Sequence, residues 1–453
     1  MNYMLDDPRE RFSSVLNDVS NNENKTLIVD NLNMDADELM LFTQSLEEND
    51  VIEELRIRNC GLSCEACRSL FAAAPPCLRI LDLSKNPIGN GLGELAHSIQ
   101  HRLSSLTHLY LNGCQLTCAN LFLLCCDVGL HDEATNAAQP LSGPRSPSSL
   151  QALEVRNNLI RCKTNEDHLL LQRFGHWVKT AELERLDLSC NSLGTDGLRA
   201  LGLAAPALCQ LELESIGLGP GCGKVVTSVI DECSIEKLCV SSNNISSSEA
   251  VSMMDAIGRN THLRQLFLGN NSFGDKGSIV LAKALQVHGC RLTTFHFYRN
   301  SVGNEGACAF AELVRDPSCC LREFDLSSNS IGDKGAQAMA AALQDHNTTL
   351  RDVRFRGNPV VNGSLSRSIR FFSKANRAGR YLLRSNLECA NAENDNSNEN
   401  GIVDVPIGLW AHVLARAGFQ LDVRYYFLQQ NPGLFIGNTQ NPIESSEIQG
   451  NVR

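Results

Sequence analysis

The stretch Leu263–Gly277, "LRQLFLGNNSFGDKG", returns twice in close copy further along the chain. Leu292–Gly306 reads "LTTFHFYRNSVGNEG" and Leu321–Gly335 reads "LREFDLSSNSIGDKG", and each copy begins 29 residues after the one before. A segment that recurs at a fixed period indicates a repeat architecture in which each copy is one structural unit. The glycines of these copies are therefore interpreted first as parts of the repeat.

One template describes most of the chain: L-x-x-L-x-L-x-x-N-x-(I/L/V/F)-G-x-x-G, with slots numbered from the first leucine. Two more clear copies begin at Leu78 and Leu183. Weaker copies begin at Ile52, Leu106, Leu150, Leu208, Ile235 and Leu350, and a degenerate one begins near Asn24, which makes about twelve units.

Each slot of the template has a physical interpretation. Apolar residues in slots four and six predict a short strand with one buried face. The amide in slot nine can serve backbone groups of the turning loop with both its donor and its acceptor. The glycine in slot twelve permits a tight turn with left-handed backbone. The slot-nine asparagines are Asn86, Asn158, Asn191, Asn243, Asn271, Asn300, Asn329 and Asn358, and two units have Cys60 and Cys114 there.

A helix is predicted after each turn. Steps of 29 residues align Leu281 with Phe310 and Met339, and one helical turn later they align Leu285 with Val314 and Leu343. Apolar positions at i and i+4 give one buried stripe. A strand and a helix of this kind cannot bury their apolar faces alone, so neighbouring units must stack.

The repeated template resembles the leucine-rich repeat proteins, in the long-repeat subclass of the ribonuclease inhibitor. The resemblance covers roughly residues 24–387 and implies an α/β solenoid shaped like a horseshoe, of about twelve strand-helix repeats. Parallel strands would line the concave side and helices the convex side. The resemblance implies little about the ligand.

Four regions flank or interrupt this solenoid. Residues 1–23 predict a helical cap, because Phe12, Val15, Leu16 and Val19 form one apolar stripe. Residues 131–149 predict a surface insert, and residues 388–401 a flexible linker. Residues 402–453 predict a helical segment that either packs on the last repeat or binds a partner, and this tail resembles those of predicted diatom proteins.

Bulk composition narrows the classes of partner. A formal charge of −11 disfavours a general nucleic-acid or anionic-membrane binder. The sequence shows neither a secretory signal nor an apolar run long enough to span a membrane, so we expect a cytoplasmic, or alternatively nuclear, monomer. In a reducing compartment the nineteen cysteines are expected to be free thiols.

Two kinds of motif could carry chemistry. The loops Gly269–Ser278, Gly217–Lys224 and Gly89–Gly93 are rich in glycine like phosphate-binding loops, but their glycines fall on the repeat's own turn. Asp275 would also place a carboxylate against a phosphate. Cys60, Cys64 and Cys67, with Cys77 as a fourth ligand, could hold zinc, but buried thiols are the simpler interpretation. We expect no cofactor, no metal and no enzymatic activity.

Slots three, five and seven point away from the core and predict the open concave face. On this face Phe267, His296 and Tyr298 lie on neighbouring strands, as exposed aromatic hot spots of protein interfaces do. Asp187, Glu212 and Glu214 predict an acidic patch that could meet a basic partner. The alternative is an ordinary solvated strand face.

These patterns predict a non-catalytic intracellular scaffold that binds a protein partner on its concave face. One alternative is a regulator of a small GTPase, because GTPase activators for Ran resemble this chain in their long-repeat horseshoe. A zinc or thiol enzyme is the other alternative.

Overall fold

A computed structural model describes residues 7–21, 23–125, 149–287 and 291–377. Within them, one parallel sheet of 12 strands follows the order of the chain from β1 to β12. The strands are β1 (Thr26–Asp30), β2 (Glu54–Arg58), β3 (Ile80–Asp82), β4 (His108–Tyr110), β5 (Ala152–Glu154), β6 (Arg185–Asp187), β7 (Gln210–Glu212), β8 (Lys237–Cys239), β9 (Gln265–Phe267), β10 (Thr294–His296), β11 (Glu323–Asp325) and β12 (Asp352–Arg354).

A helix follows each strand and a further helix precedes the first. They are α1 (Pro8–Ser20), α2 (Ala36–Glu47), α3 (Cys64–Ala73), the 3₁₀ turn η1 (Gly89–Gly91), α4 (Leu92–His101), α5 (Cys118–Leu123), α6 (Asn165–Thr180), α7 (Gly194–Leu201), α8 (Cys222–Glu232), α9 (Ser247–Arg259), α10 (Gly274–Val287), α11 (Asn304–Arg315), α12 (Asp333–Asp345) and α13 (Gly363–Arg377).

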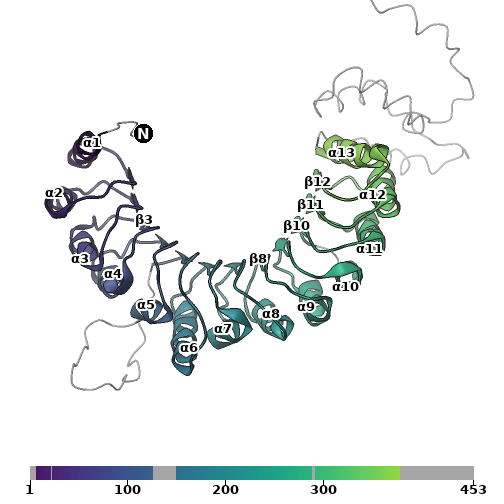
Figure 1. Cartoon of the computed structure of the whole chain (residues 1–453), viewed down its shortest axis with the longest axis horizontal. Helices are drawn as coiled ribbons and strands as arrows, with labels where there is room; N and C mark the ends of the chain where they lie inside the picture. The colour runs from purple at the N-terminus through teal and green to yellow at the C-terminus, as the bar shows by residue number, and fades with distance from the viewer. Residues whose placement is uncertain (1–6, 22, 126–148, 288–290, 378–453) are drawn as a thin grey trace, which may run out of the picture.

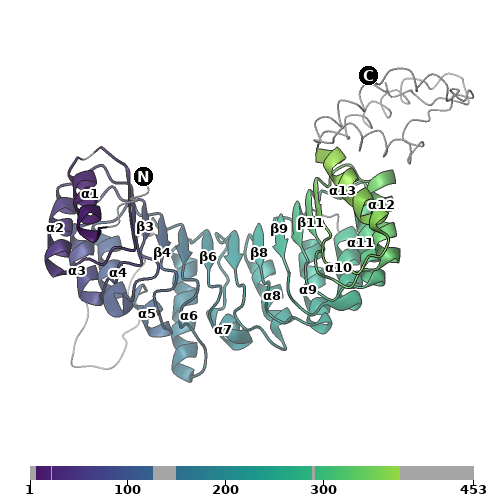
Figure 2. The same ribbon diagram turned by 45° about the horizontal axis from the view of Figure 1, so that its top comes forward.

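The units stack into an open horseshoe. Figure 1 shows the strands along the inner edge and the helices along the outer edge. Figure 2 shows the strands side by side across the concave surface. The predicted α/β leucine-rich repeat solenoid is therefore confirmed, and no helix among the described residues is long and apolar enough to cross a membrane.

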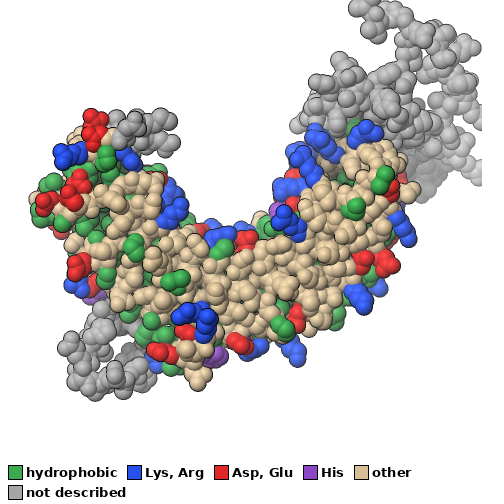
Figure 3. Space-filling model, in the orientation of Figure 1, with side chains coloured by type: hydrophobic (Ala, Val, Ile, Leu, Met, Phe, Trp, Pro, Cys, Tyr) green, Lys and Arg blue, Asp and Glu red, His purple; other side chains and the backbone are tan. Residues whose placement is uncertain are grey.

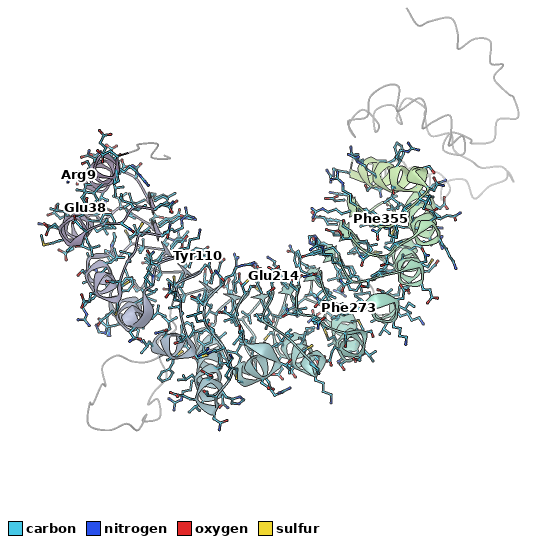
Figure 4. The ribbon with its side chains drawn as sticks, in the orientation of Figure 1. Arg9, Glu38, Tyr110, Glu214, Phe273 and Phe355 are labelled. Carbon is cyan, nitrogen blue, oxygen red and sulfur yellow. The ribbon has the colours of Figure 1, made fainter. Side chains whose placement is uncertain are left out.

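The core lies between the strand layer and the helix layer. Phe295 and Phe297, in slots four and six, are fully buried and face Phe310 on α11. Their ring centroids lie 5.8 Å and 5.3 Å from that of Phe310. Phe273, which Figure 4 labels, adds a ring whose centroid lies 5.2 Å from that of Phe297. The residues aligned by 29-residue steps, such as Met339 and Leu343, are buried as expected.

The slot-nine asparagines bond backbone groups with both donor and acceptor as predicted, and these bonds also join neighbouring units. Asn329 is typical: its Oδ1 accepts from the backbone N–H groups of Asn300 and Val302, at 2.7 Å and 3.1 Å. Its Nδ2 donates to the carbonyls of Phe297 and Leu326, both at 3.0 Å. In the cysteine-containing units the thiol takes over the donor role, since Cys60 Sγ donates to the carbonyl of Val29 at 3.4 Å.

Left-handed backbone occurs at slot eight, where the sequence did not predict it. Every unit has a positive φ there: Asn31, Asn59, Lys85, Gly113, Asn157, Cys190, Ser215, Ser242, Asn270, Arg299, Ser328 and Gly357, with values from 52° to 75°. The expected left-handed glycine in slot twelve is correct for Gly274, at +58°, but wrong for Gly303 and Gly332. Those two have φ of −96° and −92° because they are extended N-cap residues of α11 and α12.

The first helix, α1, covers the N-terminal end of the stack. Its residues Phe12, Val15 and Val19 are buried, and Asp7 caps it by accepting from Arg9 N. The insert at 131–149, except Ser149, the linker at 388–401 and the segment at 402–453 lie outside the described residues. We therefore keep the division into cap, solenoid, linker and tail as a proposal.

Candidate protein-binding face

The concave face consists of rows of side chains that run across the strands. Parallel pairing aligns Asp187 on β6 with Glu212 on β7, Cys239 on β8 and Phe267 on β9, and then with His296 on β10. Because neighbouring strands lie about 5 Å apart, side chains in one row contact each other. In Figure 4, Tyr110 and Glu214 lie on the inner side of the horseshoe, where these rows run.

The three predicted aromatic residues do come together, and we call them the aromatic cluster. The rings of Phe267 and His296 meet edge to face, with centroids 4.7 Å apart. Tyr298 covers the backbone of Gly269, where an added Cβ would lie 2.3 Å from the Tyr298 ring. The glycine in slot seven of β9's unit therefore lets the Tyr298 ring cross the neighbouring strand. All three side chains are half-buried.

Burial also determines the ionisation of these side chains. Burial lowers the pKa of His296, and nearby Asp325 opposes this shift only in part, so the imidazole is neutral at pH 7. Burial raises the pKa of the Tyr298 phenol, which stays protonated. Lys237 Nζ lies 5.5 Å from the centroid of the Phe267 ring, within the range of a cation–π contact. The cluster thus offers neutral, partly apolar contacts beside one cation.

The prediction of an acidic patch is wrong for Asp187, which is buried, and basic side chains neutralise Glu212 and Glu214. Asp187 is only 4% exposed, because its Oδ1 turns back to accept from Ser189 N at 2.8 Å. Burial raises the pKa of this carboxyl, although its bonds with Ser189 oppose the shift. A buried carboxylate cannot meet a basic partner directly.

Basic side chains from other units pair with the two remaining acids. Glu212 accepts from Lys237 at 2.7 Å and lies 3.9 Å from Arg185, which also contacts Glu154 at 2.7 Å. Glu214 pairs with Arg156 at 3.0 Å. The sequence analysis did not identify these three basic partners, Arg156, Arg185 and Lys237.

Two signals in the sequence could have identified this arrangement. The pairing bases occupy slots three and seven of units that lie one or two places from those of the acids, so they project from the same open face. The burial of Asp187 belongs to a recurring Asp-Leu-Ser pattern, since Asp82 and Asp325 bond Ser84 and Ser327 in the same way. Both signals appear only when units are compared at equal slots.

The glycine-rich loops hold carboxylates where a phosphate would bind. Asp275 Oδ1 accepts from Gly303 N at 2.7 Å and from Gly306 N at 2.8 Å, at the start of α11. Glu249 likewise accepts from Gly221 N and Gly223 N, at 2.8 Å and 2.7 Å. A negative side chain at a helix N-terminus satisfies the donors that would otherwise attract an anion. Each of these loops therefore docks one unit on the next.

The pKa shifts of Cys60 and Cys67 do not favour the thiolate. Burial raises the pKa of Cys60, and it raises that of Cys67 to about 12. A catalytic or metal-binding cysteine requires the opposite shift, because the thiolate is the reactive species. In the described part of the chain, no three His, Cys, Asp or Glu side chains are grouped closely enough to hold a metal ion.

Several known proteins are similar to this chain. The family model described as "Leucine Rich repeat" matches residues 74–91, 183–202, 259–282 and 318–340, which fall on repeats of the solenoid. These matches support the resemblance of the chain to leucine-rich repeat proteins of the ribonuclease-inhibitor-like type.

Among curated relatives, the ribonuclease inhibitor of Sus scrofa is 29% identical over 54% of this chain and 52% of its own length. The ribonuclease inhibitor of Mus musculus is 28% identical over 60% of this chain and 58% of its own. The human NACHT, LRR and PYD domains-containing protein 12 is 27% identical over 56% of this chain and 23% of its own. The chain thus spans less than two thirds of the length of each of these relatives.

Proposed function

We propose that this chain is a non-catalytic cytoplasmic scaffold that binds a protein partner on its concave face. The aromatic cluster of Phe267, His296 and Tyr298 is proposed as the centre of contact. Two of the similar proteins are named for inhibiting ribonuclease, itself a protein, and this supports a protein ligand.

The observation that carries the proposal is the local contrast on the concave face. Around the aromatic cluster, charged groups such as Glu212 and Lys237 already bond each other. The rings of Phe267 and His296 contact each other and remain only half-buried. Rigid aromatic side chains gain most from further desolvation and dominate many protein interfaces.

The charge pairs revise the expected chemistry of the partner. Glu212 and Glu214 are each bonded to a base, so the face does not select a basic protein by net charge. A partner that presents both signs at matching positions can exchange into these pairs. Such interleaved charges contribute register and specificity more than affinity.

The test is capture of partners from source-cell extract by the full chain, followed by titration of the purified partner. The triple variant Phe267→Ala/His296→Ala/Tyr298→Ala is expected to weaken binding by about a hundredfold, since hot spots contribute about 2 kcal/mol or more. The matched control is His108→Ala/Tyr110→Ala, which removes another aromatic pair from the same face, with centroids 6.4 Å apart.

Unchanged circular dichroism and melting temperature would show that the variants are folded. Equal binding by the wild type and the triple variant would refute a contact at the aromatic cluster. Equal losses of affinity in the triple variant and the control would show that the partner contacts the concave face broadly and that the aromatic cluster is not the centre of contact. Stimulated GTP hydrolysis by the captured partner would instead support the GTPase-regulator alternative.

A further inference from the structure

The last described unit is basic although the chain is acidic. Residues 350–377 contain seven Lys or Arg and one Asp, whereas the whole chain has a formal charge of −11. Figure 3 shows Lys and Arg side chains gathered over the arm that carries β12 and α13. The basic residues of this unit are Arg351, Arg354, Arg356, Arg367, Arg370, Lys374 and Arg377.

Helix α13 arranges its share of these charges in one stripe. Arg367, Arg370, Lys374 and Arg377 follow a spacing of three, four and three residues, which places them along one side of a helix. The side that carries Ile369, Phe372 and Asn376 is buried. The basic stripe is therefore the side that α13 leaves outside the core.

Local carboxylates do not balance the arginines. Arg354 and Arg377 both depend on Asp352, at 3.5 Å and 3.8 Å, and their side chains remain 51% and 60% exposed. Arg354 also lies 3.7 Å from Asp325. Among the described residues, Arg356, Arg367 and Arg370 are exposed and form no ion pair. We call Arg354, Arg356, Arg367, Arg370 and Arg377 the terminal basic face.

The chain itself supplies a complementary segment soon after α13. From Ser385 to Ala415 the sequence has no Lys or Arg and five acids: Glu388, Glu393, Asp395, Glu399 and Asp404. The first acid comes 11 residues after Arg377, and such a stretch can extend roughly 36 Å. Helix α13, with 15 residues, is only about 22 Å long. Every arginine of the terminal basic face is therefore within reach.

We propose that the acidic segment 388–404 binds the terminal basic face of its own chain. Single exposed ion pairs are weak and screened by salt. A short tether raises the local concentration of the acids to about the millimolar range, so several weak pairs suffice. The segment is an intramolecular ligand whose binding depends on ionic strength.

Docking would also affect the concave face, a consequence that rests on the proposed function. Arg354 is in register with Asp325, which is in register with His296. Two strand spacings of about 5 Å separate the terminal basic face from the aromatic cluster. The bound segment would therefore border the partner site and compete with a large partner for space.

The test uses zero-length carbodiimide coupling in the full chain at low salt, with mass spectrometry to map the products. Lys374 is expected to couple to acids of segment 388–404 within one chain. The variant Arg356→Gln/Arg367→Gln/Arg370→Gln keeps Lys374 and all five acids. In this variant we expect the fraction of chains coupled between Lys374 and the acids to fall about fivefold. We expect a similar fall for the wild type at high salt, because charges more than roughly 4 Å apart are then screened from each other.

The control Arg9→Gln/Arg68→Gln/Arg79→Gln makes the same change of charge at the other end of the solenoid and should couple as the wild type does. Equal coupling in all three proteins, and at high salt, would overturn the proposal, because the tether alone would then explain it. A second test compares the binding of poly-glutamate or RNA to the wild type and to a variant in which the five acids are replaced by Asn or Gln. Equal binding to both proteins would assign the terminal basic face to a separate partner molecule, and this too would overturn the proposal. Neither readout requires the concave-face partner.

Discussion

At the residue scale, a slot-nine asparagine such as Asn329 joins two units through four buried hydrogen bonds. Asn329 serves two N–H groups of the preceding unit with its oxygen, and a carbonyl on each side of the joint with its nitrogen. Buried backbone groups that lose such a partner cost the full desolvation penalty. The asparagine is therefore more important to stability than its size suggests.

Asn329→Ala is expected to destabilise the solenoid by about 3 kcal/mol, because two backbone N–H groups remain buried without an acceptor. Urea unfolding of the full chain measures the loss. Asn165→Ala is the control, since Asn165 is an exposed first residue of α6. A loss below about 1 kcal/mol would show that water replaces the amide at this joint.

Asp187→Asn tests the buried carboxyl of the concave face. Burial raises the pKa of Asp187 above its unfolded value of about 3.9, so the folded chain binds the proton more readily. Wild-type stability from this group is therefore present at low pH and lost as pH rises through the raised pKa. The amide does not ionise, and it can still accept from Ser189 N.

We expect Asp187→Asn to be at least as stable as the wild type at pH 7, with an advantage that disappears near pH 4. Thermal melting across that pH range measures it. The opposite result would be a variant that matches the wild type at pH 4 but is less stable than the wild type at pH 7. It would show that the charge of Asp187 stabilises the fold.

Some site residues were predictable and others were not. The adjacency of Phe267 and His296 follows from equal slots in units of equal length. The burial of Asp187 does not, because a residue in slot five can either project into solvent or turn back to the serine in slot seven. The repeat pattern assigns each residue to a slot, whereas its exposure also depends on these short-range bonds.

At the element scale, the convex helices approach each other unevenly. Helices α6 and α7 are in backbone contact at Gly175, where an added Cβ would lie 1.7 Å from the carbonyl oxygen of Leu201. Gly93 on α4 has nothing within 4 Å of the same position. The two glycines therefore predict opposite effects of one substitution.

Gly175→Ala is expected to destabilise the chain by about 3 kcal/mol, because the two helices must separate. Gly93→Ala should stabilise it by about 0.5–1 kcal/mol, since alanine has the higher helix propensity and meets no neighbour. Urea midpoints of both variants provide the comparison. Similar small effects at both sites would mean that α7 shifts freely on α6.

Strands and helices were predictable as elements because alternation and i, i+4 spacing recur in nearly every unit. The left-handed turn at slot eight was not, because that slot holds Lys85, Cys190 and Arg299 in different units. Residue type there does not reveal the turn. The turn forms whether slot nine holds an asparagine or, after Asn59, the cysteine Cys60, so the loop that all units share imposes it against a cost of about 1 kcal/mol per residue.

At the scale of the whole molecule, each unit packs on its two neighbours along the horseshoe (Figure 1). Stability in such a solenoid is approximately a sum of unit and interface terms. Damage in one arm should therefore leave the other arm intact.

Phe71→Ala removes a side chain that is 1% exposed from α3 and should cost about 4 kcal/mol locally. Hydrogen exchange followed by mass spectrometry is expected to speed up in β1–β4 and to remain unchanged in β10–β12. Faster exchange in both arms by the same factor would show that the horseshoe unfolds as one cooperative body.

The asparagine joints also bear on how such a chain changes length. The last four copies carry asparagine in slot nine and begin at equal spacings along the chain. A duplicated unit would therefore carry its own joint and find a compatible surface on both sides. Gene duplication can widen the binding surface by one strand at a time without redesigning the neighbours, so the span of the partner is a quantity that evolution can adjust in whole steps.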